Sequence, residues 1–494
     1  MRITITLFII LQILWISSLL ISQKQIWIRR KFIIVFLTSA ILIDLIWFII
    51  SAYFSSIFPL AFITLISSYQ IFNLYRAYKS QRSSEHVRNI TLSGGFKLWL
   101  IQFFLAFIIL IIYFYIPNFN LVLALSVAAY VFGLMMFISA WRSYRVTSTR
   151  LSDDVMPATD LPTLSVLIPA RNETDSLSEC LNSILANDYP KLEVLVLDDA
   201  SSNKRTPEII RSFAHDGVIF IAGKQFSTNW LAKNWAYEQL LEASNGELVM
   251  YCGADTRFQP DALKFLISSL EKRNKQMLSV MPLNELPDKF SHWFLQPLRY
   301  AWEISLPRRF LKRPPVLATC WIARREFLIN NGSFKGVSRR VAPESYFAKL
   351  ATLSDGYSFF QYSSVYSHKY QSEQLETAIR LRYPQLRRQV ESVMIASLVE
   401  FFTALSVIVL LCLSITDRNW TDLVLNLLAY LFYGLTFGTV TRLTYHKFHI
   451  ISYLAWPLFF ILDIFIMNRS MWRYELGDVL WKGRSIGPSV MKSF

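Results

Sequence analysis

Long apolar runs near both ends of the chain constrain its fold more than any other feature. Each run has about 18 residues or more, which is the length that a helix needs to cross a bilayer. The composition agrees, because 53% of the residues are hydrophobic and only 17% are charged. We therefore expect an integral, multi-pass membrane protein, as in a bacterial plasma membrane. The runs cover 3–21, 32–50, 53–75, 98–116 and 121–141, then 393–415, 423–440 and 450–467.

Basic residues in the loops between these runs predict the orientation of the chain. They cluster at 24–31 and at 76–97, and such loops usually lie on the cytoplasmic side. Five N-terminal crossings then place the N-terminus outside and the long polar stretch after residue 142 in the cytoplasm. Three C-terminal crossings would put the basic tail outside, against the same rule. The sequence therefore leaves two or three C-terminal crossings open.

Net charge and cysteine usage narrow the classes of partner and site. Lys and Arg number 50 against 35 Asp and Glu, and the basic residues lie beside the apolar runs. That placement favours anionic lipid headgroups as partners and disfavours nucleic acid. The four cysteines are far apart and form no CxxC pair, which argues against a disulfide framework or a structural zinc site. The sequence identifies no protein partner.

The polar stretch between the two apolar regions alternates short aliphatic runs with amphipathic ones. This alternation predicts βαβ units and an α/β domain with a mainly parallel, doubly wound sheet. We expect a membrane region over 1–142, the α/β domain over 160–389, a second membrane region over 390–468 and a basic tail over 469–494. The expected strands are 164–168, 192–197, 218–221, 248–251 and 278–281, and the expected helices are 177–185, 207–213, 233–242 and 261–272.

Carboxylates follow two of the expected strands at the point where each ends. Asp198 and Asp199 follow one strand, and Asp255 follows another after a short turn. Ligands of open α/β sheets bind at the carboxyl ends of the strands, and a carboxylate there can accept hydrogen bonds from a nucleoside or hold a cation. The simpler alternatives are helix capping for the first pair and an Asx-turn for Asp255.

Four segments of this domain resemble family 2 glycosyltransferases in their order and spacing. They are 165–173 (SVLIPARNE), 198–201 (DDAS), 229–236 (NWLAKNWA) and 253–256 (GADT). Membrane-bound members that glycosylate carotenoids, hopanoids and ceramide are the most similar. The resemblance implies a GT-A nucleotide-sugar domain, a UDP-sugar donor, Mg²⁺ or Mn²⁺ as cofactor, and inverting transfer to a membrane lipid.

The resemblance also assigns roles to particular residues. Asp255 would bind the metal, and Lys233, which opens a helix, would hold phosphate; a solvated helix lysine is the equal alternative. Glu344, next to the position of the family's catalytic Asp, is the candidate for the base that deprotonates the acceptor, and a residue that merely favours a helix start is the simpler alternative. Gln385 and Arg388 would lie at the membrane surface of the catalytic site. The arginines around 380–388 fit an interfacial helix on anionic headgroups equally well. The residues that would line the nucleotide pocket are Pro169, Arg171, Glu173, Asp198 and Asp199.

Three positions depart from the family pattern. Gly253 stands where the family usually has an Asp, Ser345 where it has the catalytic Asp, and Gln389 where processive synthases have a Trp. Either Glu344 replaces the catalytic Asp, or the acceptor is a phosphate or carboxylate that needs little deprotonation, or activity is lost. A non-catalytic binding or scaffold protein and a polysaccharide synthase are therefore the alternatives to a lipid glycosyltransferase. The segment 481–484 (WKGR) resembles a carboxy-terminal signature of carotenoid-type and hopanoid-type members, without an assigned role.

Overall fold

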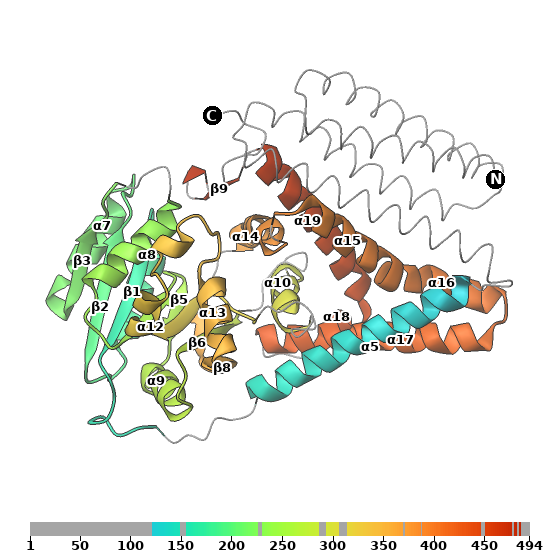
Figure 1. The fold of residues 1–494 in the computed structure, drawn as a ribbon, viewed down its shortest axis with the longest axis horizontal. Helices are drawn as coiled ribbons and strands as arrows, with labels where there is room; N and C mark the ends of the chain where they lie inside the picture. The colour runs from blue at the N-terminus through green and yellow to red at the C-terminus, as the bar shows by residue number, and fades with distance from the viewer. Residues whose placement is uncertain are drawn as a thin grey trace, which may run out of the picture.

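The computed structural model consists of an α/β domain joined to a group of long apolar helices (Figure 1). The four expected crossings before residue 117 lie outside the residues that the structure describes. Those residues are 121–148, 155–225, 230–285, 293–305, 314–368, 371–386, 388–445, 450–476, 479–481 and 484–485.

An eight-stranded sheet forms the centre of the α/β domain, and its strands run in the order β3-β2-β1-β4-β7-β6-β8-β5. The first four strands of that order are parallel to one another, as the sequence predicts. All five expected strands are confirmed, with ends that differ by three residues at most. Their bounds are Leu164–Ala170 (β1), Leu192–Asp198 (β2), Val218–Ala222 (β3), Leu248–Cys252 (β4) and Met277–Asn284 (β6).

The other half of the sheet contains three strands that the sequence pattern did not indicate. Strand β7 (Cys320–Arg324) lies antiparallel between β4 and β6, and β8 (Tyr357–Ser367) runs parallel to β6. The short strand β5 (Thr256–Phe258) closes this edge by pairing antiparallel with β8. The sheet is therefore mixed and mostly parallel rather than purely doubly wound.

Helices cover both faces of this sheet, so alternate side chains of one strand enter two different cores. Val166 and Ile168 of β1 pack in the core formed with α6, α7 and α9, whereas Leu167 faces α8, α12 and α13. Strands buried on both faces read as continuous apolar runs. The helices are Asp175–Leu185 (α6), Arg205–Ser212 (α7), Ala232–Ala243 (α8), Ala262–Lys272 (α9), Arg325–Asn330 (α12) and Glu344–Leu353 (α13).

Three helical segments among the described residues are long and apolar enough to cross a membrane, namely Val122–Arg145, Ser392–Thr416 and Trp420–Tyr445. The first segment is part of α5 (Leu121–Ser148), and the third is α17 (Trp420–Tyr445). The second consists of α15 (Val390–Glu400) and α16 (Ser406–Thr416), which a π-helical turn joins. Large apolar side chains remain exposed along α5 at helical spacing: Val127, Val131, Met135 and Ile138. Such a stripe suits contact with lipid chains.

The last apolar run forms two helices and is not among these three segments. Helix α18 (Ile450–Leu454) ends one residue before α19 (Trp456–Leu476) begins, and Pro457 occupies the second position of α19. Proline is tolerated in a first helical turn because its missing N–H has no partner there, but it cannot continue a preceding helix. Charged side chains, including Asp463 and Arg473, interrupt the apolar character of α19.

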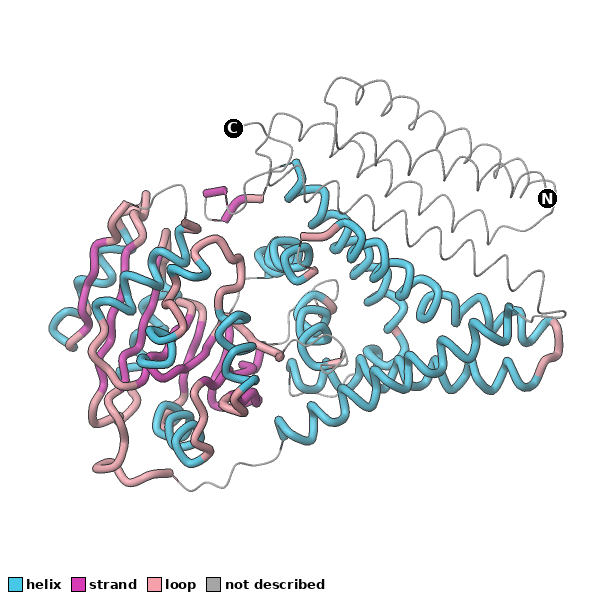
Figure 2. The backbone as a smooth tube through the Cα atoms, in the orientation of Figure 1, coloured by secondary structure: helices cyan, strands magenta, loops and turns pink. Residues whose placement is uncertain are grey.

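Helices α10 (Leu295–Ile304) and α14 (Gln371–Gln385) lie between the sheet and the apolar helices (Figure 2). A buried ion pair fixes α14 to α19, since Arg382 Nε lies 2.7 Å from Asp463 Oδ1. Arg382 also donates a hydrogen bond to the carbonyl of Leu298 in α10. Breaking a buried pair of this kind leaves an uncompensated charge, so the contact holds the three helices in one arrangement.

Candidate active site

The candidate site lies where β1 and β4 separate. β1 pairs with β2 along its whole length, through Ala170, but its pairing with β4 ends at Leu167. Chain order also reverses here, because β2 and β3 lie on one side of β1 and β4 on the other. Pro169, which has no N–H to donate, falls in the part of β1 that no longer pairs with β4. Open α/β sheets bind their ligands at such a switch point.

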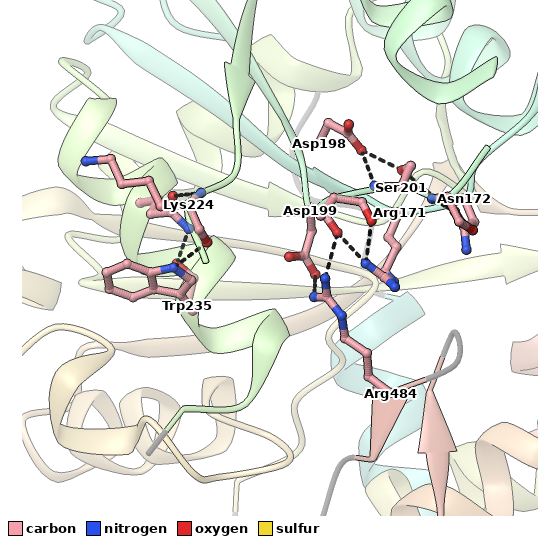
Figure 3. A network of polar contacts seen from close by, with 11 residues as sticks. Arg171, Asn172, Asp198, Asp199, Ser201, Lys224, Trp235 and Arg484 are labelled. Carbon is pink, nitrogen blue, oxygen red and sulfur yellow. Dashed lines mark hydrogen bonds and ion pairs between the residues drawn. The ribbon is translucent and has the colours of Figure 1, made fainter. Parts of the chain in front are cut away.

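Asp198 and Asp199 stand at the carboxyl end of β2 and face different partners (Figure 3). Asp198 Oδ1 accepts hydrogen bonds from the backbone N–H and the hydroxyl of Ser201, at 3.1 and 2.5 Å. Asp199 is buried, and its backbone carbonyl accepts a 2.5 Å hydrogen bond from Nη1 of Arg171. Arg171 therefore ties the loop after β1 to the loop after β2.

Both of these loops contain a residue with positive φ that is not glycine. Asn172 has φ 52° and Ala200 has φ 50°. Asparagine tolerates this region, whereas alanine rarely adopts it, and such strain gathers at functional sites. The Asn172 side-chain oxygen accepts a 2.8 Å hydrogen bond from the N–H of Ser202, which locks the two loops together. Glu173 is half-buried, and its carbonyl accepts a hydrogen bond from Thr206.

A C-terminal hairpin brings a second guanidinium to Asp199. It is formed by β9 (Leu480–Trp481) and β10 (Arg484–Ser485), which pair antiparallel. Arg484 Nη1 lies 2.6 Å from Asp199 Oδ2, and its Nη2 donates to the Asp199 carbonyl at 3.2 Å. Burial raises the pKa of Asp199 above its ordinary value, although Arg484 and Arg171 act in the opposite direction. The carboxylate is thus buried and depends on its two arginine neighbours.

Lys233 and Glu344 form a second group of charged side chains in the site. Lys233 is the second residue of α8, and its Nζ lies 4.9 Å from the centroid of the Tyr237 ring. Burial opposes its charge, yet the pKa of Lys233 is raised because Tyr237 and Glu344 favour the ammonium form. Glu344 begins α13 and is buried, and its Oε2 has no hydrogen-bond partner among the described residues. An unused buried carboxylate oxygen beside a cation is suited to bind a proton or a substrate hydroxyl.

Ser345 does not present its hydroxyl to this group. The hydroxyl donates a 2.7 Å hydrogen bond to the carbonyl of Ala342, in the turn that starts α13. This is a local hydrogen bond from a serine side chain to the backbone carbonyl three residues earlier, a contact that serine often makes. Of the two neighbours, Glu344 therefore has the geometry that a base requires.

Asp255 lies in the turn between β4 and β5, half-buried, with its backbone carbonyl accepting a 2.8 Å hydrogen bond from the N–H of His368. A Cβ atom built at Gly253 would lie 2.3 Å from Oδ1 of Asp255, so the carboxylate occupies the space that glycine leaves. Across the described part of the chain, no three His, Cys, Asp or Glu side chains form a metal-binding group. The Asp255 carboxylate is suited to bind Mg²⁺ or Mn²⁺. Such a cation can bind a single protein carboxylate and take its remaining ligands from phosphate oxygens and water.

Gln385 and Arg388 lie at the end of α14, near the membrane helices. Gln385 donates to Glu303 Oε1 in α10 at 3.2 Å and accepts a hydrogen bond from Arg382. Arg388 has φ 55°, and its guanidinium lies 5.1 Å from the centroid of the Tyr474 ring in α19. In the described structure these two residues therefore contact the helix junction, and their expected catalytic role stays a prediction.

The structure thus places the sequence-predicted residues in several separate settings. Arg171 and Asp199 form one group, Lys233 and Glu344 a second, and Asp255 stands in the turn after β4. Sequence reasoning missed Asn172, Ser201 and Arg484 as members of the site. The residues 481–484 carried the only signal for Arg484, because their motif had no assigned role.

Comparison with known proteins identifies the domain that carries this site. Residues 165–332 match the family model described as glycosyl transferase family 2. The glycosyltransferase AglE of Haloferax volcanii is 34% identical over 99 residues, which are 19% of this chain and 31% of that protein. The hyaluronan synthase of Streptococcus pyogenes is 29% identical over 113 residues, or 22% of this chain and 26% of that one. The matched regions thus span less than a third of these relatives.

Solved structures that resemble parts of this chain include a mannosyltransferase, PcManGT from Pyrobaculum calidifontis, in complex with GDP-Man and Mn²⁺. It has a TM-score of 0.45 and 17% identity, and the match covers 70% of this chain and 97% of that one. S. aureus TarS 1-349 in complex with UDP-GlcNAc has a TM-score of 0.33 and 17% identity, over 64% and 92% of the two chains. The family match and the named relatives support a transferase.

Proposed function

We propose that this chain, whose residues 165–332 form a glycosyltransferase family 2 domain, transfers one sugar from a UDP-sugar to a membrane lipid with inversion. The observation that carries the proposal is the placement of Arg171, Asp199 and Asp255 shortly after β1, β2 and β4, three neighbouring parallel strands on the two sides of the switch point. A nucleoside would lie against the ends of β1 and β2, and its diphosphate would extend toward the turn after β4. The sugar would then face α13 and the membrane-proximal helix α14.

Each side chain of the site would have its own role in the proposed reaction. Asp198 and Asp199 accept hydrogen bonds from the nucleoside, and Lys233 at the start of α8 attracts the diphosphate together with the helix N-terminus. Glu344 takes the proton from the acceptor hydroxyl while that oxygen attacks the anomeric carbon and the bond to the diphosphate breaks. A divalent cation held by Asp255 would neutralise charge on the departing diphosphate.

The membrane contributes proximity in this proposal. A lipid acceptor partitions into the bilayer, so only its head group must reach the site. Helices α10 and α14 share one hydrophobic core with residues of β6, β8 and the apolar helices, and the exposed stripe of α5 suits a lipid environment. Holding both substrates at one surface converts a bimolecular encounter into a local one.

Contacts before and after helices α18 and α19 favour a tail on the same side as the α/β domain. Tyr445, at the end of α17, donates a 3.2 Å hydrogen bond to the carbonyl of Trp293, and Arg484 binds Asp199. Helices α18 and α19 would then begin and end on the side of the α/β domain, an arrangement with two C-terminal crossings. This orientation also satisfies the positive-inside rule for the tail.

Cysteine labelling tests the orientation. In a Cys412→Ser background, we expect Asp188→Cys in the α/β domain and Arg473→Cys in α19 to react with a membrane-impermeant maleimide from the same side. Both positions carry exposed or partly exposed side chains. Intact cells should protect both cysteines and inverted vesicles should expose both. Labelling from opposite sides would refute the two-crossing arrangement.

Nucleotide release tests the catalytic proposal. Purified protein in lipid nanodiscs should release UDP from one member of a UDP-sugar panel, only when Mn²⁺ or Mg²⁺ and an acceptor lipid extract are present. Excess EDTA should stop the reaction and added Mn²⁺ should restore it, since the cation is supplied from solution. Binding of UDP without turnover under every condition would instead favour the non-catalytic alternative.

Polysaccharide synthesis is the second candidate, because the hyaluronan synthase and a poly-beta-1,6-N-acetyl-D-glucosamine synthase of Staphylococcus epidermidis, 28% identical over 112 residues, are among the relatives. Gln389 stands against it, since the resembling processive enzymes have a Trp at this place to stack on the growing sugar chain. Product mass decides between the two. A lipid that gains a single sugar supports the first proposal, and a polymer supports the second.

A further inference from the structure

The C-terminal hairpin reaches the nucleotide side of the site from the far end of the chain. Arg484 and Asp199 are 285 positions apart in the sequence. The hairpin follows α19, the last helix of the apolar group, so one short segment joins that group to the end of β2. The family resemblance gives this segment no role, and the mechanism above does not use it.

The contact between the two residues is specific rather than a surface encounter. Asp199 has 8% of its side chain exposed and Arg484 has 20%. The guanidinium binds Asp199 with two nitrogens, one on the carboxylate and one on the backbone carbonyl, which fixes both the side chain and the loop. Arginine is suited to this because its planar fork presents donors in a rigid geometry. Figure 3 shows Arg484 and Arg171 meeting at Asp199 from different segments.

The buried Asp199 carboxylate needs a cationic partner, and Arg484 is that partner. The carboxylate lies out of water, and burial of an unpaired charge is costly. Arg171 contacts the carbonyl oxygens of Asp199 and Ala200, whereas Arg484 is the residue that bonds to the carboxylate itself. Without Arg484, the carboxylate would lose the donor that orients it.

We propose that Arg484 is a positioning residue for the nucleotide. The C-terminal hairpin forms part of the nucleotide pocket, and Arg484 holds the Asp199 carboxylate in the orientation that binds the nucleoside of a nucleoside diphosphate. The inference rests on the proposed function, because it assigns the nucleoside to the end of β2. It predicts that loss of Arg484 weakens nucleotide binding while leaving the catalytic groups Glu344 and Asp255 in place.

Binding measurements on the full chain in nanodiscs test the inference, with UDP and GDP in Mg²⁺ as probes. Arg484→Ala should weaken binding of the preferred nucleotide by about tenfold or more, which is the effect of losing one charge-assisted hydrogen bond. The donor KM should rise by a similar factor, with kcat at saturating donor within about twofold of wild type. The nucleotide affinity of Arg484→Lys should lie between those of wild type and Arg484→Ala. Arg473→Ala is the matched control, because its partner Glu376 is exposed and distant in sequence from the pocket.

The pH dependence of stability without nucleotide tests the ion pair by itself. Burial already raises the pKa of Asp199, and loss of Arg484 should raise it further. A carboxyl whose folded pKa is raised destabilises the fold as pH rises through that pKa. The melting temperature of Arg484→Ala should therefore be close to that of wild type at pH 4 and clearly lower at pH 7. Arg473→Ala should show no such divergence.

The outcomes separate this inference from the proposed function. If wild type binds neither UDP nor GDP, the proposed function fails and takes the positioning role with it, whatever the pH profile shows. If wild type binds nucleotide and Arg484→Ala binds it equally well, the positioning role is wrong and the proposed function stands. Tighter binding by Arg484→Ala would also overturn the inference, because it would mean that the arginine occupies the place of the ligand.

Discussion

Replacing Asp255 by alanine is expected to reduce sugar transfer by at least about a hundredfold. Among the described residues, no group of three or more His, Cys, Asp or Glu side chains could hold a metal ion, so the proposed site would use Asp255 together with oxygen atoms of the diphosphate and of water. Cation stabilisation of a leaving group is worth several kcal/mol, and each 1.4 kcal/mol corresponds to about a factor of ten in rate. The measurement is release of UDP over a titration of Mn²⁺, with folding checked by thermal unfolding.

Two further variants sharpen this test. Gly253→Ala should lower the rate by about tenfold, because the new Cβ would approach Oδ1 of Asp255 to 2.3 Å and force the carboxylate to move. Asp188→Ala removes an exposed carboxylate whose partner is Lys264, and it should keep wild-type activity. If the Asp255→Ala variant folds and keeps full turnover, the assignment of Asp255 as a metal ligand is wrong.

Replacing Glu344 by glutamine is expected to lower kcat by about 10²- to 10⁴-fold, the range that a positioned general base contributes. Glutamine keeps the shape of the side chain and cannot accept the proton, so the donor KM should change little. The buried Oε2 without a partner is the structural reason to expect this effect. Initial rates over a donor titration separate kcat from KM.

Ser345→Ala is the control for the base. The Ser345 hydroxyl only donates to the carbonyl of Ala342, so this variant should retain most of the wild-type kcat. If Ser345→Ala loses activity while Glu344→Gln keeps it, the assignment is wrong. If both keep activity, the acceptor is a group that needs no base, such as a phosphate.

The parallel half of the sheet could be predicted from the sequence, because its strands are buried on both faces and read as apolar runs. β2 is an example, with Val194 and Val196 in one core and Leu195 in the other. Strand β7 escaped prediction since Cys320–Arg324 is short and depends on pairing with β4 and β6, which are distant in sequence. Likewise β5 exists only because β8 lies beside it.

The sequence predicted the placement of residues at strand ends but not the long-range contacts, and the roles assigned to the site residues stay predictions. Asp199 and Asp255 follow strands, so their placement was visible in the sequence. The contact of Lys233 with Tyr237 lies within α8, but the electrostatic interaction of Lys233 with Glu344 relates α8 to α13, more than a hundred residues later, and no local pattern encodes it. The ion pair of Arg382 with Asp463 was missed for the same reason.

The hairpin that contacts Asp199 also has a consequence for biosynthesis. The ribosome makes the β2 end of the pocket 285 residues before Arg484, and the helices Ser392–Thr416 and Trp420–Tyr445, which are long and apolar enough to cross a membrane, are made between them. If Arg484 positions the nucleotide, a nascent chain that has not yet reached the hairpin has an incomplete nucleotide pocket. Full affinity for the donor then arises only after α19 and the hairpin have been made.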